Sequence, residues 1–225
     1  MSLTDLEIIQ AVNALYGPVG SDPTAWAHLD TGAGDGIYWA VKAAGGFSLV
    51  IFRGSVTGLD WLRDLEAIPF YDRELGLVHD GFFTAMRTVW GEALPTISSG
   101  PWVACGHSLG AARAALLAGL GVVHGMPPAA VVLFGEPRPG GEKLASILSS
   151  VPLRSYRNVG ADGHDEVTDE PPHAPIPFRH AGYPKRPLID LTASSAPGDF
   201  SPFRFHHSAL YEAATEKLSP MPTTR

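Results

Sequence analysis

Residues 101–125 place three local signals side by side, and this arrangement constrains the fold more than any other part of the chain. "PWVAC" is a short apolar run typical of a buried strand, and "LGAARAALLAGLGVVHG" is a run of strong helix formers. Between them lies Ser108, in a G-x-S-x-G pattern with Gly106 and Gly110. The pattern predicts a strand that turns sharply into a helix, because a side chain at either glycine would collide with the strand or the helix.

The rest of the chain alternates between strand-like and helix-like segments, which predicts an α/β fold with a mostly parallel central sheet flanked by helices. Two β-rich runs within residues 36–55 surround Gly45-Gly46 and predict an antiparallel hairpin in the N-terminal half. Residues 160–205 are rich in proline and are expected to form mostly loops. The other predicted elements are an N-terminal helix capped by Thr4 or Ser2, a helix over 82–94, strands at 129–135 and 151–159, and helices at 142–148 and 206–218.

Composition limits the class of protein. The 225 residues are 45% hydrophobic and 17% charged, without a repeat or linker, so we expect one globular domain spanning 1–225. The net charge of −7 and the lack of a Lys/Arg cluster argue against nucleic-acid binding. Cys105 is the only cysteine. Neither a signal peptide nor a run of roughly 18 apolar residues is seen, which favours a cytoplasmic location.

A serine hydroxyl is a weak nucleophile, so Ser108 would need a base and an acid that orients the base. In α/β-hydrolases these follow in the order serine, acid, histidine. The acids that follow Ser108 in predicted loops or at strand ends are Glu136, Asp162, Asp165, Glu166, Asp169 and Glu170. The histidines are His124, His164, His173, His180, His206 and His207. Residue chemistry alone does not choose among them.

Several further motifs occur in a fixed order along the chain. They are "VIFRGS" with "DWLRDL", then "VHDGF", then "GHSLGAA" and finally "LFGEPRPG". In this order they resemble the class 3 lipases, the fungal-type triacylglycerol lipase family, over residues 37–212. The resemblance implies an α/β-hydrolase fold with an N-terminal antiparallel hairpin. It also implies a serine carboxylic-ester hydrolase that needs no cofactor and no metal.

The resemblance assigns roles to individual residues. Ser108 becomes the nucleophile, and the backbone N–H groups of Ser55 and Leu109 form the oxyanion hole. Arg53 would support the Ser55 loop. His107 is expected to pack away from Ser108.

The acid and the base follow from the same resemblance, each with one rival. Asp165 in "DEVTDEPP" keeps the family's spacing to the following valine and prolines, but extra residues after Asn158 leave Asp162 as the alternative. In "FHHSALYEA" the base is expected to be His207, because Ser208 follows directly and Tyr211 comes one turn later. His206 is the alternative. Adjacent residues point to different sides, so at most one of these two histidines faces Ser108.

Residues 57–76 occupy the position of the family's lid. Trp61, Leu62, Leu65 and Ile68 fall on one helical stripe, which could contact a lipid interface or simply pack as a fixed helix. The substrate is expected to be an acylglycerol or another acyl ester. The alternatives are a short-chain or feruloyl-type esterase, an acyltransferase, and an inactive lipase-like binding protein. The oligomeric state does not follow from the sequence.

Overall fold

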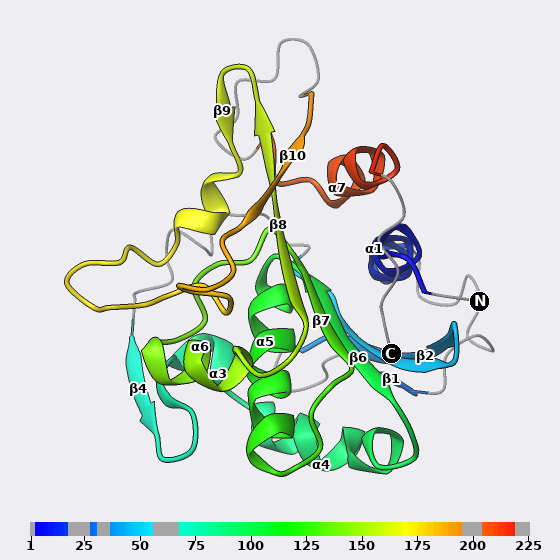
Figure 1. Cartoon of the computed structure of the whole chain (residues 1–225), viewed down its shortest axis with the longest axis vertical. Helices are drawn as coiled ribbons and strands as arrows, with labels where there is room; N and C mark the ends of the chain where they lie inside the picture. Colours follow the sequence, from blue (N-terminus) through cyan, green and yellow to red (C-terminus); the bar gives the residue numbers. More distant parts are fainter. Residues whose placement is uncertain (1–2, 18–27, 31–36, 56–67, 195–203, 219–225) are drawn as a thin grey trace.

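The computed structural model describes residues 3–17, 28–30, 37–55, 68–194 and 204–218. Within them an eight-stranded sheet runs through the centre of the molecule in the order β1-β2-β3-β6-β7-β8-β10, with β9 (Gly163–His164) paired to β8 (Figure 1). Helices cover both faces of this sheet. The predicted α/β class is therefore confirmed.

The N-terminal part of the sheet is antiparallel, as the sequence predicts. β1 (His28–Asp30) pairs with β2 (Trp39–Ala44), which forms a hairpin with β3 (Phe47–Phe52). Gly45 and Gly46 join the two strands with φ values of 58° and 84°. A two-residue turn with positive φ at both positions matches the right-handed twist of the strands, and glycine adopts it without steric cost.

The rest of the main sheet is parallel apart from β9. β6 (Trp102–His107) lies between β3 and β7 (Ala130–Phe134), and β8 (Leu153–Gly160) and β10 (Ile189–Thr192) continue the sheet. The strands expected at 101–105, 129–135 and 151–159 are thus confirmed. β10 was not predicted, because four residues with mixed burial give little signal inside a loop-rich segment.

Two groups of helices bury the two faces of the sheet. On one face lies α5 (Leu109–Val123), with α3 (Asp80–Phe83), α4 (Met86–Ile97) and α6 (Glu142–Leu148) around it. The other face carries α1 (Asp5–Ala14) and α7 (Ser208–Thr215), which contact each other. The side chains of β6 alternate accordingly: Trp102 and Ala104 belong to the α5 core, and Val103 and Cys105 belong to the α1 core.

Helix α1 is fixed at its N-terminal end. Thr4 and Glu7 form a capping box there, which confirms Thr4 as the cap. Buried Asp5 accepts hydrogen bonds from the Arg154 guanidinium at 2.5 and 2.7 Å and another from the Tyr156 hydroxyl, so the first turn is tied to β8. These contacts hold the helix against the sheet.

Two segments differ from the expected secondary structure. The helix predicted over 82–94 is split into α3 and α4, because Ala85 adopts a left-handed conformation with φ of 60°. Residues 69–79, which include the end of the segment expected to form the lid, form a hairpin of β4 (Pro69–Asp72) and β5 (Gly76–His79). Trp61, Leu62 and Leu65 of the predicted stripe lie outside the described residues, and Ile68 is 49% exposed. In the described part of the chain, no helix is long and apolar enough to cross a bilayer.

Candidate active site

The C-terminal ends of four neighbouring parallel strands carry the residues singled out by the sequence. Ser55 lies just beyond β3, Ser108 follows β6, Gly135 follows β7, and Asp165 comes after β8 and β9. In α/β sheets this edge is where ligands bind, because the loops that leave the strands converge there. The fold therefore collects side chains from widely separated parts of the chain at one place.

Ser108 sits on a sharp strand-to-helix turn. Its backbone has φ of 60° and ψ of −132°, a conformation that costs a non-glycine residue about 1–3 kcal/mol and is typical of functional sites. A Cβ at Gly110 would lie 2.2 Å from the Phe52 carbonyl oxygen, and one at Gly106 would lie 2.4 Å from that of Gly110. Only glycine fits at either position, and the predicted strand–turn–helix is confirmed.

The loop after β3 packs directly against this turn. A Cβ at Gly54 would lie 2.7 Å from the Ser108 Cβ and 2.8 Å from the His107 carbonyl oxygen. Ser55 follows at once, and Leu109 begins α5, where a backbone N–H has no partner inside the helix. Of the two residues expected to form the oxyanion hole, Leu109 thus follows Ser108 directly and Ser55 follows a residue that packs on Ser108. The positive end of the α5 dipole points toward Ser108.

Asp165 is fully buried and accepts three hydrogen bonds. Its Oδ2 accepts one from His206 Nδ1 at 2.7 Å and one from the Tyr211 hydroxyl at 2.5 Å, while Oδ1 accepts one from the Val167 N–H at 3.0 Å. Burial alone would raise the pKa of Asp165, but the His206 charge and the hydrogen bonds from His206 and Tyr211 hold that pKa below its usual value. The rival Asp162 is exposed at the β8–β9 turn and pairs with Arg204 at 3.2 Å.

The histidine beside Asp165 is His206, which corrects the expectation of His207. His206 is 3% exposed, whereas His207 is exposed and serves as the N-cap residue of α7. His206 is the last residue of a turn and His207 has extended backbone, and the two side chains point to different sides of the chain. Helix α7 begins at Ser208, two residues later than the predicted start at 206, so both histidines precede the helix.

Two polar side-chain atoms beside His107 are buried without a hydrogen-bond partner among the described residues. They are the Oγ of Ser108 and the Nε2 of His206. Ser108 follows His107 in the chain, and the ring centroid of His206 lies 4.7 Å from that of His107. Because Nδ1 of His206 donates to Asp165, Nε2 of the neutral ring is a proton acceptor. Buried polar atoms are usually paired, so each exception needs an explanation, and a catalytic role is one of them.

Asn158 and Tyr211 hold the Asp165–His206 pair in place, and sequence reasoning did not find these roles. The backbone of Asn158 donates to the Tyr211 hydroxyl at 3.2 Å and accepts from the Asp165 N–H at 2.9 Å. Its side-chain amide donates to the Phe205 carbonyl at 2.8 Å, one residue before His206. One residue of β8 thus anchors the acid loop, the segment before α7 and α7 itself. The proximity of Tyr211 to the histidine pair in the sequence was the available signal.

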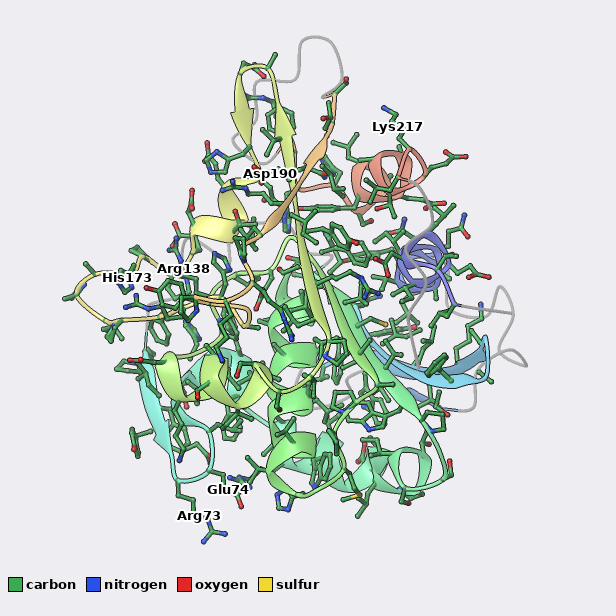
Figure 2. The ribbon with its side chains drawn as sticks, in the orientation of Figure 1. Arg73, Glu74, Arg138, His173, Asp190 and Lys217 are labelled. Carbon is green, nitrogen blue, oxygen red and sulfur yellow. The ribbon has the colours of Figure 1, made fainter. Side chains whose placement is uncertain are left out.

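The "FGEPRPG" motif shapes the space around this pair. Gly135 has φ of 59°, and a Cβ there would lie 2.7 Å from Asp165 Oδ2 and 3.0 Å from His206 Cε1. Arg138 lies beside the acid loop (Figure 2) and donates from its guanidinium to the carbonyl oxygens of Asp169 and Pro171. The motif therefore leaves room for the buried pair and ties down the loop that carries Asp165.

The acidic loop that follows β9 does not assemble a metal site among the described residues, where no group of three His, Cys, Asp or Glu could hold an ion. His164 pairs with Asp169 at 2.7 Å, and the His173 ring contacts the Phe178 carbonyl at 3.0 Å and the Arg179 guanidinium. The two histidines of the loop are therefore engaged by neighbouring residues of the same loop.

Glu136 is a second fully buried carboxylate and lies outside the Asp165–His206 pair. It accepts hydrogen bonds from Ser155 Oγ at 2.8 Å and from the Ala181 N–H at 3.0 Å. Burial raises the pKa of Glu136 from 4.5 to about 7, and the two hydrogen bonds only partly oppose that shift. The folded state therefore binds a proton over a pH range in which the unfolded chain does not.

We expect Glu136→Gln to change how stability depends on pH. Because the folded pKa is raised, the wild type should lose about 1.4 kcal/mol of unfolding free energy per pH unit from this group as pH rises from 4.5 to about 7. The glutamine amide would keep both contacts without titrating. The difference in unfolding free energy between the variant and the wild type, measured in urea at pH 5 and pH 8, should grow at the higher pH. Glu92→Gln, at an exposed position, is the control, and equal pH dependence in all three proteins would contradict the prediction.

Comparisons with known proteins agree with this geometry. A family model described as lipase (class 3) matches residues 49–174, which is more than half of the chain. A Rhizomucor miehei lipase in complex with its propeptide is 22% identical with a TM-score of 0.62, over 82% of this chain and 62% of that one. A Penicillium expansum triacylglycerol lipase is 17% identical with a TM-score of 0.63, over 85% and 79%.

A third solved structure, a mono- and diacylglycerol lipase from Aspergillus oryzae, is 22% identical with a TM-score of 0.59, over 88% of this chain and 82% of that one. The chain spans less than two thirds of the length of the Rhizomucor miehei chain. No curated protein sequence matches it. The family model, the order of the motifs and the strand-turn-helix that carries Ser108 lead to one assignment. This chain belongs to the class 3 lipase family and has an α/β-hydrolase fold.

Proposed function

We propose that this protein hydrolyses carboxylic esters through a triad of Ser108, His206 and Asp165. One observation carries the proposal: the Ser108 hydroxyl and His206 Nε2 are both buried beside His107 without a partner among the described residues, while Nδ1 of His206 is held by Asp165. A hydroxyl and a proton acceptor that are both buried and otherwise unpaired are available to act together as nucleophile and base.

The acylation step uses these groups in sequence. His206 Nε2 takes the proton of Ser108 as the Oγ attacks the ester carbonyl carbon, and Asp165 stabilises the imidazolium that forms. The N–H groups of Leu109 and Ser55 bind the oxyanion, and each such donor is typically worth about 3 kcal/mol in the transition state. The intermediate then collapses, the ester C–O bond breaks, and the alcohol leaves with the proton from His206.

Deacylation repeats the same chemistry with water. His206 removes a proton from a water molecule as the water oxygen attacks the acyl-enzyme carbonyl. The second tetrahedral intermediate breaks the bond to Ser108 Oγ, which regains its proton from His206, and the carboxylic acid is released. With an alcohol in place of water, the same steps transfer the acyl group, so acyltransfer is a competing outcome of one site.

The exposed part of residues 57–76 favours an acyl substrate presented at a lipid surface. Ile68, Phe70 and Tyr71 are 49%, 43% and 75% exposed, and they follow one another on and just before edge strand β4. Such clustering of large apolar side chains on a surface is typical of sites that contact a protein or a membrane. We therefore favour acylglycerols over soluble short-chain or aromatic-acid esters.

The test is a chain-length series of nitrophenyl and glycerol esters, assayed below and above the solubility limit of each ester. We expect activity on all soluble esters and a rate increase when long-chain esters form an emulsion. Tyr71→Ser should reduce only the emulsion rate, because its side chain contributes apolar area to the surface and is far too exposed to support the core. Equal losses on soluble and emulsified esters would contradict the lipid-surface contact. Turnover of short esters alone would favour the esterase alternative.

A further inference from the structure

We propose that Tyr16 and His107 are positioning residues that connect the oxyanion loop to the catalytic base through one buried hydrogen-bonded chain. The inference rests on the proposed function, since it concerns the groups that act in ester hydrolysis. From the sequence, His107 was expected only to pack, and Tyr16 was assigned no role.

The chain has three links. The Gly54 N–H donates to the Tyr16 hydroxyl at 2.9 Å, the hydroxyl meets His107 Nδ1 at 2.8 Å, and His107 Nε2 meets the backbone carbonyl of His206 at 2.8 Å. Gly54 immediately precedes Ser55, and the carbonyl belongs to His206 itself. The three hydrogen bonds therefore run from the residue that precedes one proposed oxyanion donor to the backbone of the proposed base, through the residue that precedes Ser108.

The direction of each proton in this chain is determined by its ends. The His206 carbonyl can only accept, so His107 carries its proton on Nε2 and its Nδ1 is an acceptor. The Tyr16 hydroxyl must then donate to Nδ1, and its oxygen accepts from the Gly54 N–H. Every group is satisfied in one arrangement, and reversing any link would leave two donors or two acceptors facing each other.

The surroundings keep His107 neutral. The ring is 4% exposed and lies among Tyr16, His206 and Tyr211, with ring centroids 4.7–5.8 Å away. Burial, with a smaller contribution from His206, lowers the pKa of His107 to about 3, so the ring stays uncharged where a histidine base works. A neutral ring holds the backbone of His206 without adding a positive charge beside an imidazole that must become protonated.

Tyr16 is itself fixed to the same loop through its neighbours. The Leu15 carbonyl accepts a hydrogen bond from the Arg53 guanidinium at 3.2 Å, and that guanidinium lies 3.8 Å from the centre of the Tyr38 ring. The end of α1 thus contacts Arg53 and Gly54 together. Because oxyanion donors act only when they are already in position, small displacements of this loop should lower the transition-state stabilisation rather than substrate binding.

Tyr16→Phe is the first test, because it removes only the hydroxyl. We expect kcat per active site, counted by titration with a fluorophosphonate, to fall about tenfold with KM unchanged, as two hydrogen bonds that position reacting groups are lost. Tyr38→Phe is the matched control: it removes the hydroxyl of a buried tyrosine beside the same loop, outside the chain of contacts. The NMR resonance of the His206 Nδ1 proton should move in Tyr16→Phe and stay in place in Tyr38→Phe.

Substitutions of His107 test whether His107 and Tyr16 act through the same chain of hydrogen bonds. His107→Leu should cost about as much as Tyr16→Phe, and the double variant should cost little more than either, because one chain is broken in each case. His107→Gln, which keeps a donor and an acceptor, should recover most of the rate. If His107→Leu fails to fold, the comparison of Tyr16→Phe with Tyr38→Phe decides alone.

The positioning role is overturned if Tyr16→Phe matches Tyr38→Phe in kcat per titrated site while the wild type is active and Ser108→Ala is not. Multiplicative losses in the double variant would also overturn it. An active Ser108→Ala would overturn the proposed function, and the positioning role with it. The Ser108→Ala result therefore separates failure of the two proposals.

Discussion

Replacing Ser108 by alanine is expected to lower kcat for ester hydrolysis by about 10⁶-fold, to the rate left by binding and the oxyanion hole. The expectation follows from the strained turn at Ser108 and from its buried, unpartnered hydroxyl, which no other described serine combines. The fold should survive, because Oγ makes no hydrogen bond within the described residues. Initial rates on a soluble nitrophenyl ester measure the loss of activity, and a thermal unfolding curve measures whether the fold is retained.

A fluorophosphonate provides an independent readout. It should label the wild type once, at Ser108, and should leave Ser108→Ala unlabelled. Ser155→Ala is the matched control, since Ser155 is also buried but its hydroxyl donates to Glu136. Label retained in Ser108→Ala, located by peptide mapping, would show that another residue is the nucleophile.

The parts of the fold and site that the sequence predicted well depend on short stretches of chain. The elbow around Ser108 needs two glycines at fixed offsets, and the collisions that exclude any other residue come from Phe52 and from Gly110 itself. The β2–β3 hairpin depends in the same way on Gly45 and Gly46. Such features depend on local backbone geometry, so they can be inferred from residues that are close together in the sequence.

Features that depend on contacts between distant segments could not be predicted in this way. The Tyr16–His107 contact joins residues 91 positions apart, and Asn158 reaches Phe205 across 47 positions. Nothing in the local pattern around Tyr16 distinguishes it from an ordinary residue after a helix. The break at Ala85 is similar: alanine favours helix, and its positive φ lies between α3 and α4, both of which bury side chains in the core.

The acid shows how spacing and burial complement each other. Spacing to a valine and two prolines favoured Asp165 over Asp162, and the structure buries the first and exposes the second. The β8–β9 turn explains the extra residues, because it places Asp162 at its exposed tip before the chain returns to Asp165. The same spacing argument failed at the base, where a shift of one residue changes which ring faces inward.

His206→Ala should therefore lower kcat as much as Ser108→Ala does, while His207→Ala should leave kcat within about twofold of the wild type. His206 supplies the only imidazole that is hydrogen-bonded to Asp165 among the described residues. His207 is exposed and makes no side-chain capping bond to α7, so its removal costs neither the proton acceptor nor the helix. For each of the two variants, the activity is measured as the rate on a soluble ester divided by the fraction of folded protein.

Asp165→Asn extends this comparison to the orientation of the base. An amide at position 165 can present its N–H to Nδ1 and stabilise the wrong tautomer, so we expect a loss of about 10⁴-fold. Asp162→Asn should have little effect, because Asp162 is exposed and its contact is with Arg204, away from the triad. Adding Asp165→Asn to His206→Ala should cost almost nothing more, since the acid acts only through the ring that has been removed. An inactive His207→Ala or an inactive Asp162→Asn would contradict the assignment of Asp165 and His206 as acid and base.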